Sequence, residues 1–351
     1  MTTTGSQSPS FRVALIGARG HVGSEVIRLL ARHPRLELAV AASRTLAGTP
    51  VNQHVPEIDC ALSFEDLGPE QIAARGVDVH ILALPNGLAD EYVATLDRIG
   101  EQRAVVIDVS ADHRLVAPAA GGLVAPGAGG FVAPWVYGQP ERFRDRIRGA
   151  RRIANPGCYA TAAQLAIAPV RELLGQSPHV FGVSGYSGAG TRPSPKNDPE
   201  VLRDNLLPYS LTGHLHQREL SHHLGIPVYF TPHVAPFFRG ITVTVSMVLS
   251  RPIDAEGLEA RYRTFYAGEP LIQILGQEIP LVRDIAGCHH VAIGGLSVDT
   301  SDSQDMPSSD HGRHIAVVAT LDNLLKGAAT QAMQNINLAL GIDEFTAIVD
   351  P

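Results

Sequence analysis

The pattern of apolar and polar residues predicts a parallel sheet in the first half of the chain. Short, nearly uninterrupted apolar runs occupy four stretches, residues 11–16, 36–42, 77–84 and 104–109. Such runs are typical of strands that are buried on both faces. Between the first two runs, residues 24–33 carry apolar side chains at helical spacing and end before Pro34. Strands and helices in alternation predict an α/β fold with right-handed crossovers.

Beyond residue 180 the pattern becomes that of a sheet with one exposed face. Residues 228–230 and 241–249 are β-branched and alternate between apolar and polar, which is typical of antiparallel strands. Residues 321–340 then predict one long helix that is closed by Gly341.

Two stretches are predicted to be loops. Residues 116–135 are rich in Gly, Ala and Pro and predict an ordered loop, whereas the serines and aspartates of residues 299–313 predict a solvent-exposed one. The longest apolar stretch, residues 121–135, is interrupted by Pro126 and Pro134. It therefore cannot cross a bilayer as a regular helix.

Composition and charge narrow the class of protein. The 351 residues are 44% hydrophobic and 18% charged, which suits about two globular domains. Lys and Arg number 28 and Asp and Glu 35, so the net charge of −7 argues against nucleic acid or an acidic membrane surface as partner. The three widely spaced cysteines offer neither a disulfide framework nor a metal clip, and residues 1–10 lack an apolar signal segment. We expect a cytoplasmic protein.

A glycine-rich turn, Gly17-Ala18-Arg19-Gly20-His21-Val22-Gly23, follows the first predicted strand directly. Glycines between a strand and a helix let the backbone approach a pyrophosphate at the positive end of the helix. The spacing is GxxGxxG rather than GxGxxG, so the motif is only moderately specific. The alternative is a turn that is merely tight.

The end of the second predicted strand indicates which nucleotide would bind. A site for NAD usually has an acidic residue there, for the ribose 2′-hydroxyl. This chain instead has Ser43 and Arg44, and a hydroxyl beside a guanidinium suits a 2′-phosphate. The pair favours NADP, with Arg44 as an ordinary surface charge being the alternative.

The sequence Asn155-Pro156-Gly157-Cys158-Tyr159 places a thiol at the predicted start of a helix. A helix dipole stabilises a thiolate at that position and makes it a nucleophile. The alternative is a small buried core residue, as cysteines often are. Cys60 and Cys288 lack such a setting and are interpreted as structural.

Histidines are concentrated between residues 213 and 223. The segment Gly213-His214-Leu215-His216-Gln217-Arg218-Glu219 could supply a general base for the thiol. His214, His216 and Glu219 could also be metal ligands, but their spacing is not HExxH, and surface or core histidines are a third reading. On a helix His214 and His216 would point in different directions, so at most one would face the thiol.

Four cations beside predicted turns suggest an anionic small ligand in this acidic protein: Arg114, Arg192, Arg239 and Lys326. Each of them alone is more often a surface charge.

Read in order, Gly-Ala-x-Gly-x-x-Gly, Pro-Gly-Cys-Tyr-x-Thr and His-x-His-x-x-Glu make the chain resemble the N-acetyl-γ-glutamyl-phosphate reductase family over about residues 11–342. Supporting segments begin at Ala83, Val109, Tyr137, Ser187, Phe230, Arg239 and Asp322. The stretch 193–211 looks like the fungal-type branch of the family. The chain departs from the family pattern at His113, often Phe, at Arg218, often Pro in bacterial members, and in a longer loop at 299–313.

The resemblance implies a role for each candidate residue. Cys158 would be the nucleophile, His216 the acid/base and His214 a residue of the substrate pocket, while Arg114 and Arg239 would hold substrate anions. The NADP site would be lined by Gly17, Arg19, Gly20, His21, Val22, Gly23, Ser43, Arg44, Pro85, Asn86, Gly188 and Asn335. No metal is implied.

The resemblance also implies the architecture and the reaction. A Rossmann-type NADP-binding domain would span residues 1–157 and be completed by 321–351, with an α+β catalytic and dimerisation domain at 158–320. The reaction would be NADPH-dependent reduction of the acyl phosphate to the semialdehyde through a Cys158 thioester, in a homodimer or homotetramer. The rival interpretations are a reductase of aspartyl or carrier-bound aminoadipyl phosphate and a non-catalytic NADP-binding regulator.

Overall fold

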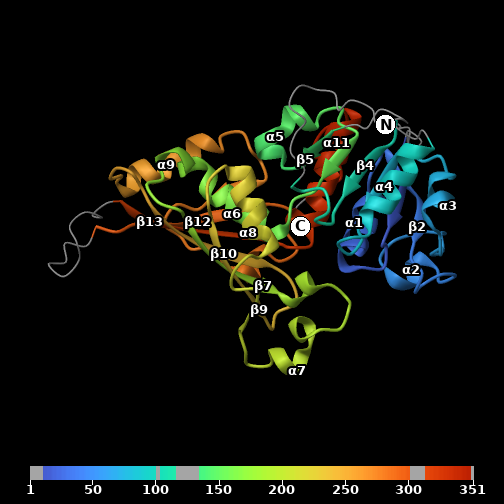
Figure 1. The fold of residues 1–351 in the computed structure, drawn as a ribbon, viewed down its shortest axis with the longest axis horizontal. Helices are drawn as coiled ribbons and strands as arrows, with labels where there is room; N and C mark the ends of the chain where they lie inside the picture. Colours follow the sequence, from blue (N-terminus) through green and yellow to red (C-terminus); the bar gives the residue numbers. More distant parts are fainter. Residues whose placement is uncertain (1–10, 100–102, 116–133, 301–312, 349–351) are drawn as a thin grey trace, which may run out of the picture. The chain divides into compact units, whose positions relative to one another are not determined.

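The computed structural model describes residues 11–99, 103–115, 134–300 and 313–348, and their contacts divide into two compact units. Unit 1 contains the described residues up to Pro156 and those from Ala328 onward, and unit 2 runs from Gly157 to Gly327 (Figure 1). Residues 116–133 and 301–312, most of the two predicted loops, lie outside the described part. No helix of the described part is long and apolar enough to cross a membrane.

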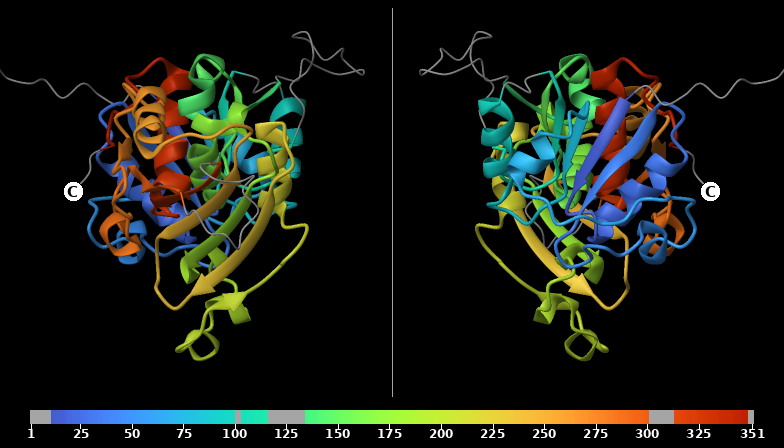
Figure 2. Two further views of the ribbon diagram at one scale, coloured as in Figure 1. Left: turned by 90° about the vertical axis from the view of Figure 1, so that its left-hand side faces the viewer. Right: turned by 90° about the vertical axis from the view of Figure 1, so that its right-hand side faces the viewer.

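Unit 1 is built on six parallel strands in the order β2-β1-β3-β4-β6-β5. The strands are β1 (Phe11–Ile16), β2 (Leu36–Ala42), β3 (Val79–Leu82), β4 (Val105–Asp108), β5 (Trp135–Tyr137) and β6 (Arg152–Ala154). Figure 2 shows β1 and β2 side by side in blue. The helices are α1 (His21–Ala31), α2 (Val51–His54), α3 (Pro69–Ala73), α4 (Ala89–Arg98), α5 (Pro140–Ile147) and α11 (Thr330–Leu340).

The four strands predicted from apolar runs are confirmed as β1 to β4. Every residue of β3 and β4 is buried, as expected for strands covered on both faces. β1 lies between β2 and β3, so the crossovers leave it in opposite directions. At such a switch point, ligands bind beyond the carboxyl ends of the strands. The residues that follow β1 and β3 therefore occupy the ligand-binding edge of this sheet.

Unit 2 is built on a mixed seven-stranded sheet in the order β11-β12-β13-β10-β7-β9-β8. Its strands are β7 (His179–Gly185), β8 (Leu207–Pro208), β9 (Tyr229–Ala235), β10 (Ile241–Val248), β11 (Ile272–Ile274), β12 (Val291–Val298) and β13 (His314–Leu321). Its helices are α6 (Cys158–Ile167), α7 (Pro199–Leu202), α8 (Leu215–Leu224), α9 (Ala255–Phe265) and α10 (Val282–Ile285), with short turns η1 (Ala168–Leu173), η2 (Tyr186–Ala189) and η3 (Pro195–Asn197). A further turn, η5 (Leu325–Ala329), begins in unit 2 and ends in unit 1.

The alternation predicted around residues 241–249 is confirmed in β10. Val243, Val245 and Met247 are fully buried in one core with the side chains of α6, whereas Thr244 and Ser246 are exposed. The apolar face of the sheet is thus covered by a helix of the same chain.

Three details of the predicted elements are wrong. The first helix begins at His21 rather than residue 24, because Gly20 is its N-cap. β9 pairs with β7 in parallel, since the chain returns to the sheet through α8. Trp135, predicted to lie in a loop, begins β5.

The helix predicted over residues 321–340 is also wrong in its first part. Leu321 is the last residue of β13 and pairs with Ile241 of β10. The Asp322 carboxylate then accepts hydrogen bonds from the backbone N–H groups of Leu324 (2.8 Å) and Leu325 (3.1 Å). A π-helical turn, η5, follows, and α11 begins only at Thr330.

Candidate active site

Cys158 is the first residue of α6. The chain leaves β6, turns at Asn155-Pro156-Gly157 and enters the helix with Gly157 as N-cap. The first backbone N–H groups of a helix have no partner within it and carry the positive end of its dipole. The half-buried Cys158 thiol therefore lies where a thiolate, and an oxyanion formed at it, would be stabilised.

Helix α8 is bonded to the turn that precedes this cysteine. The fully buried Glu219 carboxylate accepts a hydrogen bond from the Gly157 N–H, with an N···Oε1 distance of 2.9 Å. His216 is three residues earlier on α8 and therefore shares the face of the helix that carries Glu219. Its ring centroid lies 5.8 Å from that of Tyr159, the second residue of α6. The structure thus brings His216 to the first turn of the cysteine helix.

His214 stands just outside α8 as its N-cap, so only His216 of the two histidines lies on the helix. Its Nδ1 accepts a hydrogen bond from the His216 backbone N–H (3.1 Å), and the two ring centroids are 4.9 Å apart. Burial, and next the positive charge of Lys196, lower the pKa of His214 to about 4. The ring is therefore neutral near physiological pH, as its role as an acceptor requires.

Two tyrosines that were not predicted as site residues lie near the cysteine. The Tyr159 hydroxyl donates to the His233 carbonyl at 2.7 Å, and the Tyr209 ring centroid lies 5.5 Å from that of His214. Burial raises the pKa of both tyrosines, and the nearby charge of Cys158 raises it further. Tyr159 directly follows the cysteine in the sequence motif, but nothing local to Tyr209 indicates that it returns to this position.

Gly327 packs directly on the cysteine. A Cβ at this position would come within 2.7 Å of the Cys158 Cβ, so no larger residue could be placed there without moving one of them. Its neighbour Lys326, predicted as a loop cation, is fully buried in the η5 turn. Gly327 could be seen in the sequence, but the need for glycine at this position follows only from its contact with Cys158, a distant residue of unit 2.

The two arginines predicted to hold substrate anions both have partners within the protein. In unit 1 the Arg114 guanidinium donates to the carbonyls of Asn155 (2.8 Å) and Val109 (2.7 Å). In unit 2 Arg239 pairs with the fully buried Asp322 at 2.6 Å. Both guanidinium groups are therefore bound by groups of their own unit, and their contact with substrate stays a prediction.

The glycine-rich turn follows β1 at the switch point of unit 1. Gly17 has φ of +82°, and a Cβ there would lie 2.1 Å from the Ala83 carbonyl oxygen at the end of β3. A Cβ on Gly23 would lie 2.5 Å from the Ala18 carbonyl oxygen. A Cβ on Gly20, the N-cap of α1, would meet the protein only at 3.5 Å. The space beside Gly20 suits a pyrophosphate at the helix N-terminus.

The other predicted cofactor residues of unit 1 lie around the glycine turn and just beyond the ends of β2 and β3. Ser43 and Arg44 directly follow β2, and the Arg44 side chain is 89% exposed, with the Asp66 carboxylate 3.8 Å away. Exposed Pro85 and Asn86 follow β3. Half-buried Arg19, His21 and Val22 belong to the turn and the start of α1. These positions suit a nucleotide that extends from the glycine turn to the end of β2.

Two predicted cofactor residues lie elsewhere. Asn335 is fully buried in α11, where its amide donates to the Gly138 carbonyl (2.9 Å) and to Asn155 Oδ1 (3.0 Å). Gly188 lies in η2 of unit 2. Their roles toward the cofactor stay predictions.

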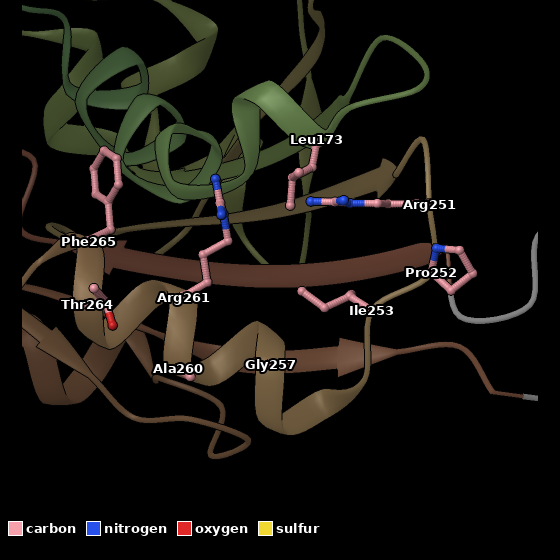
Figure 3. A pocket seen from close by; sticks show the side chains of 9 residues that line it. All are labelled: Leu173, Arg251, Pro252, Ile253, Gly257, Ala260, Arg261, Thr264 and Phe265. Atoms are coloured by element: carbon pink, nitrogen blue, oxygen red, sulfur yellow. The ribbon is translucent and has the colours of Figure 1, made fainter.

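The described residues contain no group of three His, Cys, Asp or Glu side chains arranged to hold a metal ion. A pocket of about 570 Å³ lies between η1 and α9 in unit 2 (Figure 3). Leu173, Ile253 and Phe265 line it, and the guanidinium of Arg261 donates to the Pro169 carbonyl. None of the predicted site residues lines this pocket.

Two family models match the chain, and the boundary between them lies close to the boundary between unit 1 and unit 2 at Gly157. The NAD binding domain of semialdehyde dehydrogenases matches residues 12–150, and their dimerisation domain matches residues 158–323. Among solved structures, aspartate semialdehyde dehydrogenase II from Vibrio cholerae has a TM-score of 0.70 at 20% identity, covering 95% of this chain and 99% of that one. A Candida albicans aspartate semialdehyde dehydrogenase with NADP has a TM-score of 0.65 at 16% identity, covering 94% and 99%. The fold is that of the semialdehyde dehydrogenases.

Sequence relatives narrow the class further. N-acetyl-gamma-glutamyl-phosphate reductase of Xanthomonas campestris is 52% identical, with 96% of this chain and 98% of the relative covered. The protein of that name from Stenotrophomonas maltophilia is 50% identical, with 97% and 98% covered. The chain belongs to the N-acetyl-gamma-glutamyl-phosphate reductase family, which confirms the resemblance found in the sequence.

Proposed function

We propose that the chain reduces N-acetyl-γ-glutamyl phosphate with NADPH to N-acetyl-L-glutamate 5-semialdehyde and phosphate, a step of arginine biosynthesis. The observation that carries the proposal is the thiol of Cys158 at the N-terminus of α6, with His216 at the same turn, in a chain about 50% identical over its length to reductases of this name. Reduction of an acyl phosphate through a thioester requires a thiol as nucleophile and a general acid–base such as an imidazole beside it.

The mechanism follows from the chemistry of these two side chains. The Cys158 thiolate attacks the acyl carbonyl, and phosphate departs to leave a thioester. NADPH, when bound, supplies the hydride that reduces the thioester. His216 accepts the thiol proton at the start and donates a proton to the developing alkoxide, after which the thiohemiacetal releases the aldehyde. The N-terminal backbone N–H groups of α6 stabilise the oxyanion.

Turnover in the reverse direction tests the proposal. The purified protein should reduce NADP⁺ in the presence of N-acetylglutamate semialdehyde and phosphate, which is followed by the absorbance of NADPH. Aspartate semialdehyde and carrier-bound aminoadipate semialdehyde are the comparison substrates. If the protein preferred either of these semialdehydes, the proposed substrate would be wrong. If it turned over none of the three, the chain would instead be interpreted as an NADP-binding regulator.

The nucleotide preference is predicted to depend on Arg44. We expect Arg44→Ala to weaken NADPH binding by about 1–3 kcal/mol, the scale of a charge-assisted hydrogen bond, and to leave NADH binding nearly unchanged. The Arg44 guanidinium is available for a 2′-phosphate because Asp66 approaches it only to 3.8 Å. Arg98→Ala, which removes another exposed arginine of unit 1, is the control for net charge in fluorescence titrations. Equal losses for both nucleotides would refute the assignment.

We propose that the protein is a homodimer or homotetramer that uses the outward face of β7 and β9. Phe181 and Tyr229 on this face are 44% and 53% exposed, and their rings contact those of His233 and His179. Contiguous exposed patches of this kind mark contact surfaces. We expect Phe181→Lys to shift the protein toward monomer in light scattering at micromolar concentration. Phe265→Lys alters an equally exposed phenylalanine on α9 and should leave assembly unchanged. A monomeric wild type would contradict the proposal.

The cytoplasm is the proposed location. All three cysteines are free thiols in the structure, as in proteins of reducing compartments.

A further inference from the structure

A lysine that sequence analysis did not single out lies beside the ring cluster of the active site. Lys196 belongs to η3, in the segment between η2 and α8. Its Nζ lies 4.7 Å from the centroid of the Tyr209 ring, which in turn lies 5.5 Å from the His214 ring. The contacts therefore run from Lys196 through Tyr209 and His214 to His216. The ammonium group stands at the end of this series that is remote from the acid/base.

The backbone that carries Lys196 is held in place by the next residue. The Asn197 amide donates hydrogen bonds to the carbonyls of Gly190 and Arg192, both at 2.9 Å. Its Oδ1 accepts a hydrogen bond from the Ser194 N–H at 2.8 Å. Figure 1 shows the following segment, with α7, projecting from the sheet of unit 2. The Asn197 bonds tie the base of this projection to the end of η2, so the backbone beside Lys196 is held in place.

The described part of the chain supplies no counter-ion for the charge of Lys196. Among the described residues, no carboxylate forms an ion pair with its ammonium group, whereas Arg239 is paired with Asp322 and Arg203 with Glu200. Its positive charge contributes, after burial, to the lowered pKa of His214. A half-buried cation without a counter-ion, beside neutral rings, attracts an anionic ligand more strongly than one in bulk water.

We propose that Lys196 binds the α-carboxylate of the acyl phosphate substrate. The assignment rests on the proposed function and adds a specificity-determining residue to it. The phosphate of that substrate is bonded to the carbon that Cys158 attacks, whereas the carboxylate is separated from that carbon by three others. The Lys196 ammonium group contacts the Tyr209 ring and acts on His214, and among the described residues no contact joins it to the Cys158 thiol. It is therefore placed for the anion that lies farther from the attacked carbon.

Reverse turnover separates the two anions, because carboxylate and phosphate then arrive on different molecules. We expect Lys196→Met to lower kcat/KM for N-acetylglutamate semialdehyde by about 10- to 100-fold, the effect of losing a charge-assisted hydrogen bond, with kcat/KM for phosphate unchanged. Lys196→Arg keeps the charge and should restore most of the loss. Arg203→Met removes one positive charge from the same projecting segment and should have no effect.

A second measurement does not depend on turnover. N-acetylglutamate should protect the Cys158 thiol from iodoacetamide in the wild type and in Arg203→Met, but not in Lys196→Met. If the wild type fails to use the semialdehyde, the proposed function is wrong, and the protection assay still reports on Lys196. A loss confined to kcat/KM for phosphate, or full protection in Lys196→Met, would overturn the assignment.

Discussion

Cys158→Ala is expected to abolish turnover while NADPH binding survives. Without the thiol there is no group at the start of α6 that can form the thioester. Cys158→Ser should behave alike, because a serine hydroxyl has no comparably accessible anion near neutral pH. Both substitutions leave room for Gly327, whose missing side chain lets it approach the Cys158 Cβ, so the packing of unit 2 should be retained. Steady-state assays and nucleotide titration of the same preparations test the prediction.

Alkylation provides the control for this prediction. All three cysteines are half-buried, so access alone would not select among them. Cys288 donates its thiol hydrogen to the Asp284 carbonyl (3.6 Å), which favours the unreactive thiol form. Iodoacetamide should therefore modify Cys158 before Cys60 and Cys288, and the acyl phosphate should protect it. Wild-type turnover in Cys158→Ala, or faster reaction at Cys60, would contradict a covalent mechanism.

Local patterns were sufficient to predict the parallel sheet and the position of the thiol. Every residue of β3 and β4 is buried, as are the last four residues of β1 and the last three of β2, so these strands can be predicted from their own apolar runs. The motif around Cys158 likewise contains its own strand, turn and helix. By contrast, residues 321–329 have apolar spacing that suits a helix, but pairing of Leu321 with β10 and bonding by Asp322 place them in a strand and a turn.

The rest of the site depends on contacts between distant parts of the chain. Glu219 is recognisable as a partner of the turn before Cys158 only once α8 is packed against α6. Tyr209 and Lys196 lie on a segment whose sequence predicts turns and carries charge. It does not predict that these two side chains come to lie beside His214. The cations that the sequence offered most plainly, Arg239 and Lys326, are buried or paired within unit 2. A cation beside a glycine in the sequence predicted neither the carboxylate that pairs with Arg239 nor the burial of Lys326.

His216→Asn is expected to lower kcat by about 100- to 10,000-fold, the usual contribution of a general acid–base group. His216 shares its face of α8 with Glu219, which is bonded to Gly157, so its ring is held at the turn that carries the thiol. Asparagine keeps a polar side chain of similar size but cannot exchange a proton near neutral pH. The same substitution should also slow alkylation of Cys158, because the base that assists thiolate formation is lost.

His214→Asn is the matched control, since asparagine is a favourable N-cap and should preserve the start of α8. We expect it to raise KM more than it lowers kcat. The pH profile separates the two histidines independently. With its pKa lowered to about 4, His214 is neutral above that value and changes no charge between about pH 5 and 8, where a general base must titrate. An acidic limb of kcat/KM in that range should persist in His214→Asn and vanish in His216→Asn. The reverse pattern would assign proton transfer to His214, and the neutral ring that caps α8 would then have to gain a proton during turnover.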